Sequence, residues 1–275
     1  MNPIFTRYLY FKNEVVNSLL WSMLEKQYDE SLYWIYELYF SGFQEDSFSL
    51  MYEFYVMYCQ EIYPQYDGFI DKLYQEWKLN KTDHCIIGTI LKLLIESNVS
   101  LTNMMRLRQG IKTDDVLIDD TVFDTTRLTP VEIHKYNTLK LTKNMRNWSF
   151  LNRVACKYCV RRITCEEMSI SYPVVDTIDF ENWLYYASNT PIWKQRILKY
   201  KGFIDHDTKT VTIENEEFHD NYDYEPDEQS RELKEMLWSN DIENYENMSI
   251  VSFCKKYGEN NVYRKINIIV SRNSI

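Results

Sequence analysis

The first hundred residues carry apolar side chains at the three- and four-residue spacing that is typical of amphipathic helices. The pattern predicts a first helix over 13–25, with Asn13 as its N-cap and with these apolar positions: Val15, Val16, Leu19, Leu20, Met23 and Leu24. Three further helices are predicted over 46–62, 67–79 and 83–97. Because the connections between the helices are short, we expect antiparallel neighbours, and therefore a solenoid-like stack of αα-hairpins.

One predicted helix differs from the others because it is apolar on every side. The segment 29–43 reads DESLYWIYELYFSGF, and Glu37 is the only charge in its central part. A helix that is hydrophobic all round has to be covered by neighbours on more than one face. We therefore predict an inner helix that Asp29 caps and that ends where Gly42 takes the left-handed position, with Trp34 in the core.

The helical pattern weakens after residue 100. Residues 101–147 are rich in Asn, Thr and Asp, which predicts a connecting region between a helical-hairpin domain over 1–100 and a mixed domain over 148–275. The elements predicted in the mixed part are a helix over 147–162, a helix from 179 to a break at 189–190, a helix from Pro191 to Gly202, a β-hairpin over 202–213, a helix over 227–238, a short helix over 249–257 and a strand in VYRKINIIV. The fold class is therefore mainly α, with a small α+β C-terminal part that contains a short hairpin.

Length and composition bound the class of protein. With 275 residues, of which 45% are hydrophobic, the chain can bury a core without a metal or a disulfide. Its six cysteines are scattered and no export signal precedes them, so we expect reduced thiols in a soluble, cytosolic-type protein. No apolar run approaches the roughly 20 residues that a bilayer requires, so no membrane partner is expected.

Charge is strongly segregated along the chain, although the net charge of -10 argues against a general nucleic-acid coat. Eight basic and no acidic residues lie within 135–165, whereas 15 acidic and three basic residues lie within 205–246. On the predicted helix over 147–162, Arg153, Lys157 and Arg161 follow one another at intervals of four and form a basic stripe. The candidate nucleic-acid-binding residues are Arg146, Arg153, Lys157, Arg161 and Arg162. They would contact a phosphate backbone, or else face solvent or the acidic region of the same chain.

Other candidate chemistry is incomplete. Cys156 and Cys159, with Cys165 nearby, suggest a metal site, but zinc usually takes four ligands and a second pair is missing. Thiols three residues apart inside a helix can equally be packed side chains. The four histidines belong to no catalytic motif, and the Asp-rich stretch over 114–124 fits a solvated loop. We predict no cofactor, no metal and no catalytic residue.

Three stretches carry a family resemblance: YELYFSGF at 36–43, NWLYYASNTPIWKQRILKYKGFID at 182–205 and YDYEPDEQSRE at 222–232. They resemble a family of proteins without an assigned activity from giant nucleocytoplasmic DNA viruses of the Mimivirus type. The abundance of Asn, Lys, Ile and Tyr, beside only two alanines, indicates an AT-rich genome and agrees with the resemblance. The resemblance implies a location in the host cytoplasm, at the viral factory, or in the virion. It brings no catalytic residues.

Three functions are compatible with these patterns. We expect a non-enzymatic helical interaction or scaffold protein of a giant DNA virus, associated with the virion, that holds protein partners. The first alternative is a nucleic-acid-binding accessory protein that uses the basic helix. The second is an enzyme of a class that lacks a short motif. We favour the first reading because aromatic-rich helical stacks bind partners without needing a recognisable site.

Overall fold

The computed structural model describes residues 3–100, 126–137, 151, 154–160 and 180–237, and in these parts the chain is mainly helical with a small two-stranded antiparallel sheet. The predicted fold class is confirmed. The first part contains α1 (Lys12–Leu24), α2 (Tyr28–Phe40), α3 (Gln44–Phe54), a π-helical turn (Tyr55–Cys59), α4 (Tyr66–Leu79) and α5 (Cys85–Glu96). Then follow α7 (Pro130–Asn137), a 3-10 turn (Phe180–Asn182), α9 (Trp183–Ala187), α10 (Pro191–Lys199), β1 (Phe203–Asp205), β2 (Thr210–Thr212), α11 (Glu216–Tyr222) and α12 (Arg231–Leu237).

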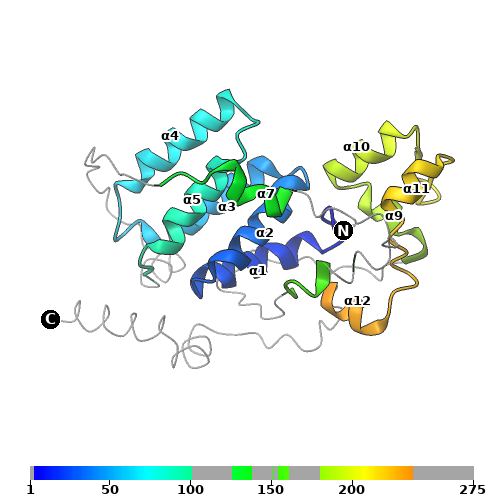
Figure 1. Ribbon diagram of the computed structural model, residues 1–275, viewed down its shortest axis with the longest axis horizontal. Coiled ribbons are helices and arrows are strands. Elements are labelled where there is room, and N and C mark those ends of the chain that lie inside the picture. The colour runs from blue at the N-terminus through cyan, green and yellow to red at the C-terminus, as the bar shows by residue number, and fades with distance from the viewer. Residues whose placement is uncertain (1–2, 101–125, 138–150, 152–153, 161–179, 238–275) are drawn as a thin grey trace.

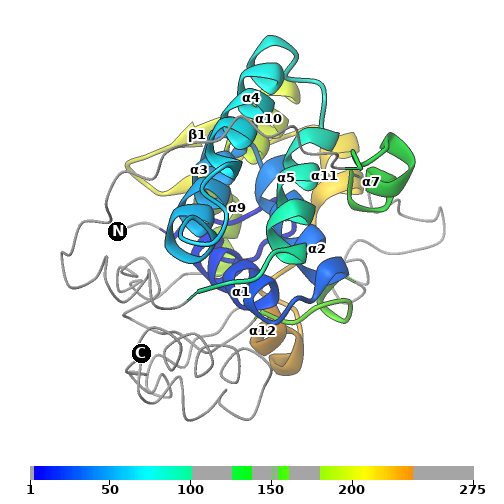
Figure 2. The same ribbon diagram turned by 90° about the vertical axis from the view of Figure 1, so that its left-hand side faces the viewer.

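The helices α1 to α5 form the stacked array that the sequence predicts. Figure 1 shows them in layers from α4 through α5 and α2 to α1, and each of these neighbouring pairs is in contact. Figure 2 shows the same array from its end. The helix α2 contacts α1, α3, α5 and α7, and Trp34 and Ile35 are both 0% exposed. The prediction of an inner helix is therefore confirmed.

The end of α2 is also as predicted. Gly42 has φ +97°, and its N–H donates to Tyr39 O at 3.2 Å, while Phe43 N–H donates to Leu38 O at 3.2 Å. This pair of hydrogen bonds is the Schellman arrangement that satisfies the last carbonyls of a helix. A side chain at Gly42 would collide with Pro191 at the start of α10, so the turn also brings the C-terminal helices against α2.

The predicted N-caps are wrong. The helix α1 begins at Lys12 with Phe11 as its N-cap, because Phe11 pairs with Phe5 in an isolated β-bridge and thereby fixes where the helix can start. The helix α2 begins at Tyr28, and Asp29 lies in its first turn, where it forms an ion pair with Lys135. Neither Asn13 nor Asp29 therefore acts as an N-cap.

The predicted helix over 147–162 is wrong at its C-terminal end. Leu151, Val154 and Ala155 are helical, but 156–157 form a turn and 158–160 are not helical. The chain leaves the helix there, and Val160 N–H donates to Met236 O of α12 at 3.5 Å. The contact with α12 thus holds Val160 outside the helix.

The region predicted as a connection contains α7, whose start has a local sequence signal. Thr129 N–H and Thr129 Oγ1 both donate to Glu132 Oε2, at 2.7 and 2.8 Å, and Pro130 takes the first helical position. Thr-Pro-x-Glu is a variant of the capping box. The division of the chain at residues 100 and 147 stays a prediction, because both boundaries adjoin residues outside the described ranges.

The C-terminal part follows the prediction in most elements. The helix α10 restarts at Pro191 with Thr190 as its N-cap, and β1 pairs with β2 in the register Phe203↔Thr212. The sequence analysis missed α11, which Asn215 caps by accepting a hydrogen bond from Phe218 N at 3.2 Å. The helix predicted over 227–238 begins only at Arg231. The helix over 249–257 and the strand VYRKINIIV lie outside the described residues.

None of the helices in the described ranges combines the length and the apolar character needed to span a bilayer. Apolar residues of the array and of the C-terminal helices belong to one core cluster, which extends from Phe5 to Leu237. Figure 1 shows α9, α10 and α11 beside the array.

Candidate functional site

Most of the predicted nucleic-acid-binding residues lie outside the described residues: Arg146, Arg153, Arg161 and Arg162. Lys157 is described and exposed. Its Nζ lies 5.5 Å from the ring centroid of Tyr33 and 5.7 Å from that of Tyr136, which is within the range of cation–π attraction. Because Lys157 lies in a turn, the predicted stripe along a continuous helix does not extend to it.

A second lysine, Lys135, lies near the Tyr136 ring. Lys135 Nζ is 4.9 Å from the Tyr136 ring centroid and forms an ion pair with Asp29 Oδ1 at 2.7 Å. Tyr136 Oη donates to the same carboxylate oxygen at 3.1 Å. The hydrogen bond from Lys135 holds the pKa of Asp29 below its usual value, while burial, and after it Lys135, lowers the pKa of Lys157. The Asp29 carboxylate therefore pairs with Lys135, and within the described part of the chain Lys157 forms no ion pair.

The thiols of the CKYC segment are both exposed. Cys156 lies in the turn after the helix, and Cys159 follows it, with its Sγ 3.8 Å from Ala155 O. The expectation that these thiols are packed inside a helix is wrong. No group of three metal-ligating side chains occurs among the described residues, and Cys165 lies outside them, so the metal interpretation stays untested.

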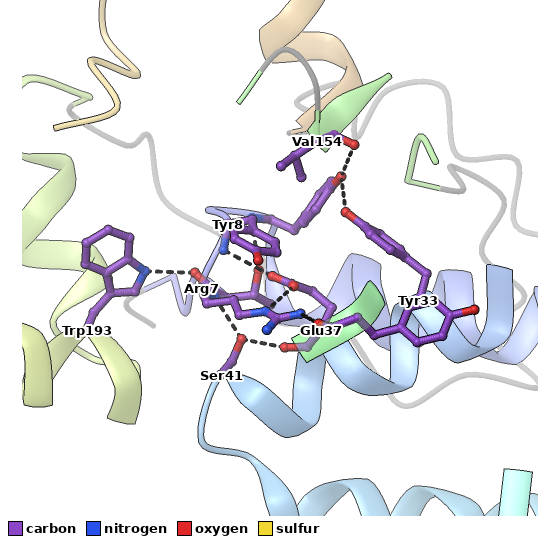
Figure 3. Close-up of polar contacts among 10 residues, drawn as sticks. Arg7, Tyr8, Tyr33, Glu37, Ser41, Val154 and Trp193 are labelled. Atoms are coloured by element: carbon purple, nitrogen blue, oxygen red, sulfur yellow. Dashed lines mark hydrogen bonds and ion pairs between the residues drawn. The ribbon is translucent and has the colours of Figure 1, made fainter. Parts of the chain in front are cut away.

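The strongest polar feature is a buried ion pair that the sequence analysis missed (Figure 3). Arg7 Nε meets Glu37 Oε2 at 2.8 Å, and the side chains are 6% and 0% exposed. The other oxygen, Oε1, accepts from Tyr8 N–H at 3.1 Å, and Arg7 Nη2 donates to Tyr136 O at 2.6 Å. Burial raises the pKa of Glu37, and Arg7 opposes this effect. The two groups of a buried ion pair stay charged only while each keeps its oppositely charged partner.

Arg7 belongs to a tight N-terminal turn over residues 4–11, which we call the N-terminal hook. Its N–H donates to Ser41 Oγ at 2.8 Å, and Ser41 Oγ donates to Glu37 O at 2.5 Å, so the hook is fixed to the end of α2. On its other side, Trp193 Nε1 donates to Thr6 O at 3.0 Å, as Figure 3 shows. The hook therefore joins the helical array to α10.

A pair of tyrosines fixes a further segment to the array. The hydroxyls of Tyr10 and Tyr33 lie 3.0 Å apart, and Tyr10 Oη donates to the carbonyls of Val154 and Tyr158 at 3.3 and 3.4 Å. Burial raises the pKa of both phenols well above the usual value, so they stay neutral hydrogen-bonding groups. Through them the segment that carries Lys157 is held against α2.

A pocket of about 360 Å³ opens between α4, the start of α5 and the segment 127–130. Its size is at the lower end for small-ligand or peptide pockets. Its walls are connected to each other: Arg127 Nη2 pairs with Glu76 of α4 at 2.6 Å, and Leu128 N–H donates to Thr89 Oγ1 of α5 at 3.1 Å. Two exposed aliphatic side chains adjoin its lining residues along the chain. Leu79, 90% exposed, precedes the lining residue Asn80, and Val131, 84% exposed, follows Pro130. We call Leu79 and Val131 the pocket rim.

A histidine lies beside this pocket in a hydrogen-bonded series. Trp77 Nε1 donates to Tyr39 Oη at 2.8 Å, and Tyr39 Oη lies 3.2 Å from His84 Nδ1. Which of Tyr39 Oη and His84 Nδ1 donates depends on the tautomer of the imidazole. Burial lowers the pKa of His84, which favours the neutral imidazole.

Comparison of the chain with protein-family models, with curated proteins and with solved structures finds no match. What the chain does is therefore inferred from its own residues. The sequence signal that could have found the buried pair is Glu37 itself, because a single carboxylate in an apolar inner helix requires a buried cation. The sequence does not say that Arg7 supplies it.

Proposed function

We propose that the chain is a non-enzymatic helical interaction or scaffold protein, which uses the stacked array to hold protein partners. The observation that carries the proposal is the pocket between α4, α5 and 127–130 with its aliphatic pocket rim. Exposed apolar residues that occur singly need no explanation, but Leu79 and Val131 are each next in the chain to a residue that lines the same concavity. Covering one such side chain contributes about 1.5–3 kcal/mol.

The fixed geometry of the array supports the same proposal. The segment 127–130 is hydrogen-bonded to both α4 and α5, and the N-terminal hook connects α2 with α10. A surface that is already rigid loses little conformational entropy when a partner binds. A partner helix or peptide can therefore gain affinity here from a modest contact area.

We also propose the setting that the family resemblance implies. The three resembling stretches include the end of α2 and the whole of α10, and they support an origin in a giant DNA virus. The protein would then act at the viral factory in the host cytoplasm, or in the virion. Mass spectrometry of purified particles and of infected-cell cytoplasm tests this proposal, and absence from both contradicts it.

The interaction function is tested by comparing three forms of the full chain as bait in infected-cell extract. The forms are the wild type, the rim variant Leu79→Ser with Val131→Ser, and the matched control Leu198→Ser, which removes an exposed leucine of α10. We expect a reproducible partner with the wild type and the control, and recovery reduced about tenfold with the rim variant. Equal recovery with all three forms, or no reproducible partner at all, contradicts the proposal.

A second function, nucleic-acid binding, is favoured by one observation. Lys157 is exposed above two tyrosine rings, and Asp29, the nearby carboxylate, is occupied by Lys135. Phosphate groups are the natural partners of such cations, and their binding weakens steeply as salt rises. A titration of the full chain with an oligonucleotide at several salt concentrations tests this function, and affinity that does not fall with salt contradicts it.

A further inference from the structure

The helix α10 and the two residues that follow it carry four basic side chains, for which the described part of the chain provides no carboxylate partner. No Asp or Glu occurs between Pro191 and Gly202, and the basic side chains there are Lys194, Arg196, Lys199 and Lys201, which we call the α10 cations. Within the described part of the chain, none of them forms an ion pair. Three other lysines of the described chain, Lys12, Lys81 and Lys135, each meet a carboxylate. A cluster of like charges without counter-charges attracts an anionic partner.

Arg196 is the best-placed of the four. Its guanidinium carbon lies 4.6 Å from the ring centroids of both Trp193 and Tyr222, so two aromatic rings hold it in place. Its Nη1 is buried without a hydrogen-bond partner among the described residues, while the residue as a whole is partly exposed. A stacked guanidinium is preorganised for phosphate, because its N–H groups keep a fixed planar fork.

Nearby carboxylates are engaged elsewhere. Glu217 of α11 accepts from Tyr200 Oη at 3.4 Å. Asp205 at the end of β1 accepts from the N–H groups of Asp207 and Thr208, at 2.8 and 3.1 Å. These contacts stabilise the turn and α11, and neither carboxylate forms an ion pair with an α10 cation.

An exposed aromatic ring follows the cations along the chain. In β1, Ile204 and its partner Val211 pack against the core, and because side chains alternate along a strand, Phe203 points away from it. Phe203 is 67% exposed and follows Lys201 by two residues. Basic side chains combined with an exposed ring are typical of surfaces that bind single-stranded nucleic acid, where phosphates meet the cations and a base stacks on the ring.

We infer that α10 and β1 form a binding surface for single-stranded nucleic acid, with the α10 cations on phosphates and Phe203 against a base. The inference rests on the second proposed function, and it places that function on an element other than the basic segment 135–165. A duplex fits less well, because its bases are stacked on one another and leave Phe203 without a partner.

An anionic lipid surface would attract the same cations but fits the apolar residues poorly. An interfacial helix inserts a continuous apolar face into the membrane. In α10 the large apolar residues Trp193 and Ile197 are both 0% exposed, because they belong to the protein core. Only Leu198 and Phe203 remain for a lipid surface.

The test measures binding of a fluorescent oligothymidylate to the full chain over a range of salt concentrations. The surface variant is Lys194→Gln, Lys199→Gln and Lys201→Gln. The matched control is Lys72→Gln, Lys78→Gln and Lys92→Gln, which removes the same charge from α4 and α5. We expect the surface variant to raise Kd about tenfold or more and to reduce the slope of log K against log salt by about 2, and the control to do neither.

A second pair of variants tests the ring. Phe203→Ser should raise Kd about tenfold, whereas Tyr52→Ser, which removes an exposed aromatic ring from α3, should leave it unchanged. A matching duplex and phosphatidylserine vesicles complete the series. Duplex binding as tight as that of the single strand, or vesicle binding without oligothymidylate binding, overturns the inference.

The results separate the inference from the function on which it rests. If the wild type and the surface variant bind oligothymidylate equally, the surface on α10 is wrong and nucleic-acid binding itself survives. If the wild type does not bind, both fail. If affinity falls in the surface variant and in Phe203→Ser but in neither control, the surface is established.

Discussion

Glu37 and Arg7 meet at 2.8 Å in the core, thirty residues apart in sequence. Without this ion pair, each residue would be a buried charge with no counter-charge. Removing the cation alone should therefore be costly. We expect Arg7→Met to lower the free energy of unfolding by about 3–5 kcal/mol, measured by urea denaturation. The matched control Lys135→Met removes one partner of the exposed pair with Asp29 and should cost less than about 1 kcal/mol.

The double variant Arg7→Met with Glu37→Leu distinguishes an unpaired charge from lost packing. Because both charged groups are replaced by apolar ones, the double variant should recover most of the stability that Arg7→Met loses. A double variant that is less stable than the single one would show that the hydrogen bonds of the pair, rather than the buried charge, dominate.

The inner position of α2 makes Trp34 a sensitive site. Its side chain is 0% exposed and lies edge-on to the rings of Tyr10 and Tyr33. Replacing it by Ala should cost about 3–5 kcal/mol, because a large cavity opens between packed helices. Tyr52→Ala, which removes a ring that is 44% exposed, is the control. Similar midpoints for the two variants in thermal unfolding would contradict the packing described for α2.

Two glycines should respond to Ala in opposite directions. Gly42 has φ +97° and faces Pro191, so Gly42→Ala meets both backbone strain and a collision, and we expect a loss of about 1–3 kcal/mol. Gly68 lies in α4 with open space around it, and Gly68→Ala should raise stability by about 0.5–1 kcal/mol. Stabilisation by Gly42→Ala would refute the proposed close approach of α10.

His84 should make the fold sensitive to mild acid. Burial lowers its pKa in the folded chain from the ordinary value of 6.5, so the unfolded chain takes up the proton at higher pH. The stability from this group is present above pH 6.5 and is lost as the pH falls below that value. Urea unfolding between pH 7 and pH 5 should show a weaker pH dependence in His84→Gln than in His134→Gln. Equal pH dependence in the two variants would exclude the effect.

The sequence predicted those elements whose signals are local. Periodicity locates α2, Gly42 ends it, and the alternation of apolar and polar residues gives the hairpin of β1 and β2. The predictions were wrong where a residue far away in the sequence determines where an element begins or ends. The β-bridge from Phe5 fixes the start of α1. Val160, predicted to be helical, instead donates a hydrogen bond to Met236 of α12.

The candidate sites were less predictable than the fold. The sequence shows Lys194 and Arg196 as helix residues, but whether a cation has a carboxylate partner depends on which segments meet in space. Glu37 indicated that a buried partner must exist, and only the folded chain identifies it as Arg7. Pockets raise the same difficulty, because the walls of this one come from α4, the start of α5 and the segment 127–130, which share no sequence pattern.

The N-terminal hook also has a consequence for synthesis on the ribosome. Its carbonyl at Thr6 accepts from Trp193, 187 residues later, and Thr190 donates to Phe5. The hook is translated before α10, so its hydrogen bonds with α10 form only after α10 has left the exit tunnel. The hook is thus synthesised before α10 but reaches its final hydrogen bonding only afterwards. Closing the long loop between the hook and α10 also costs conformational entropy.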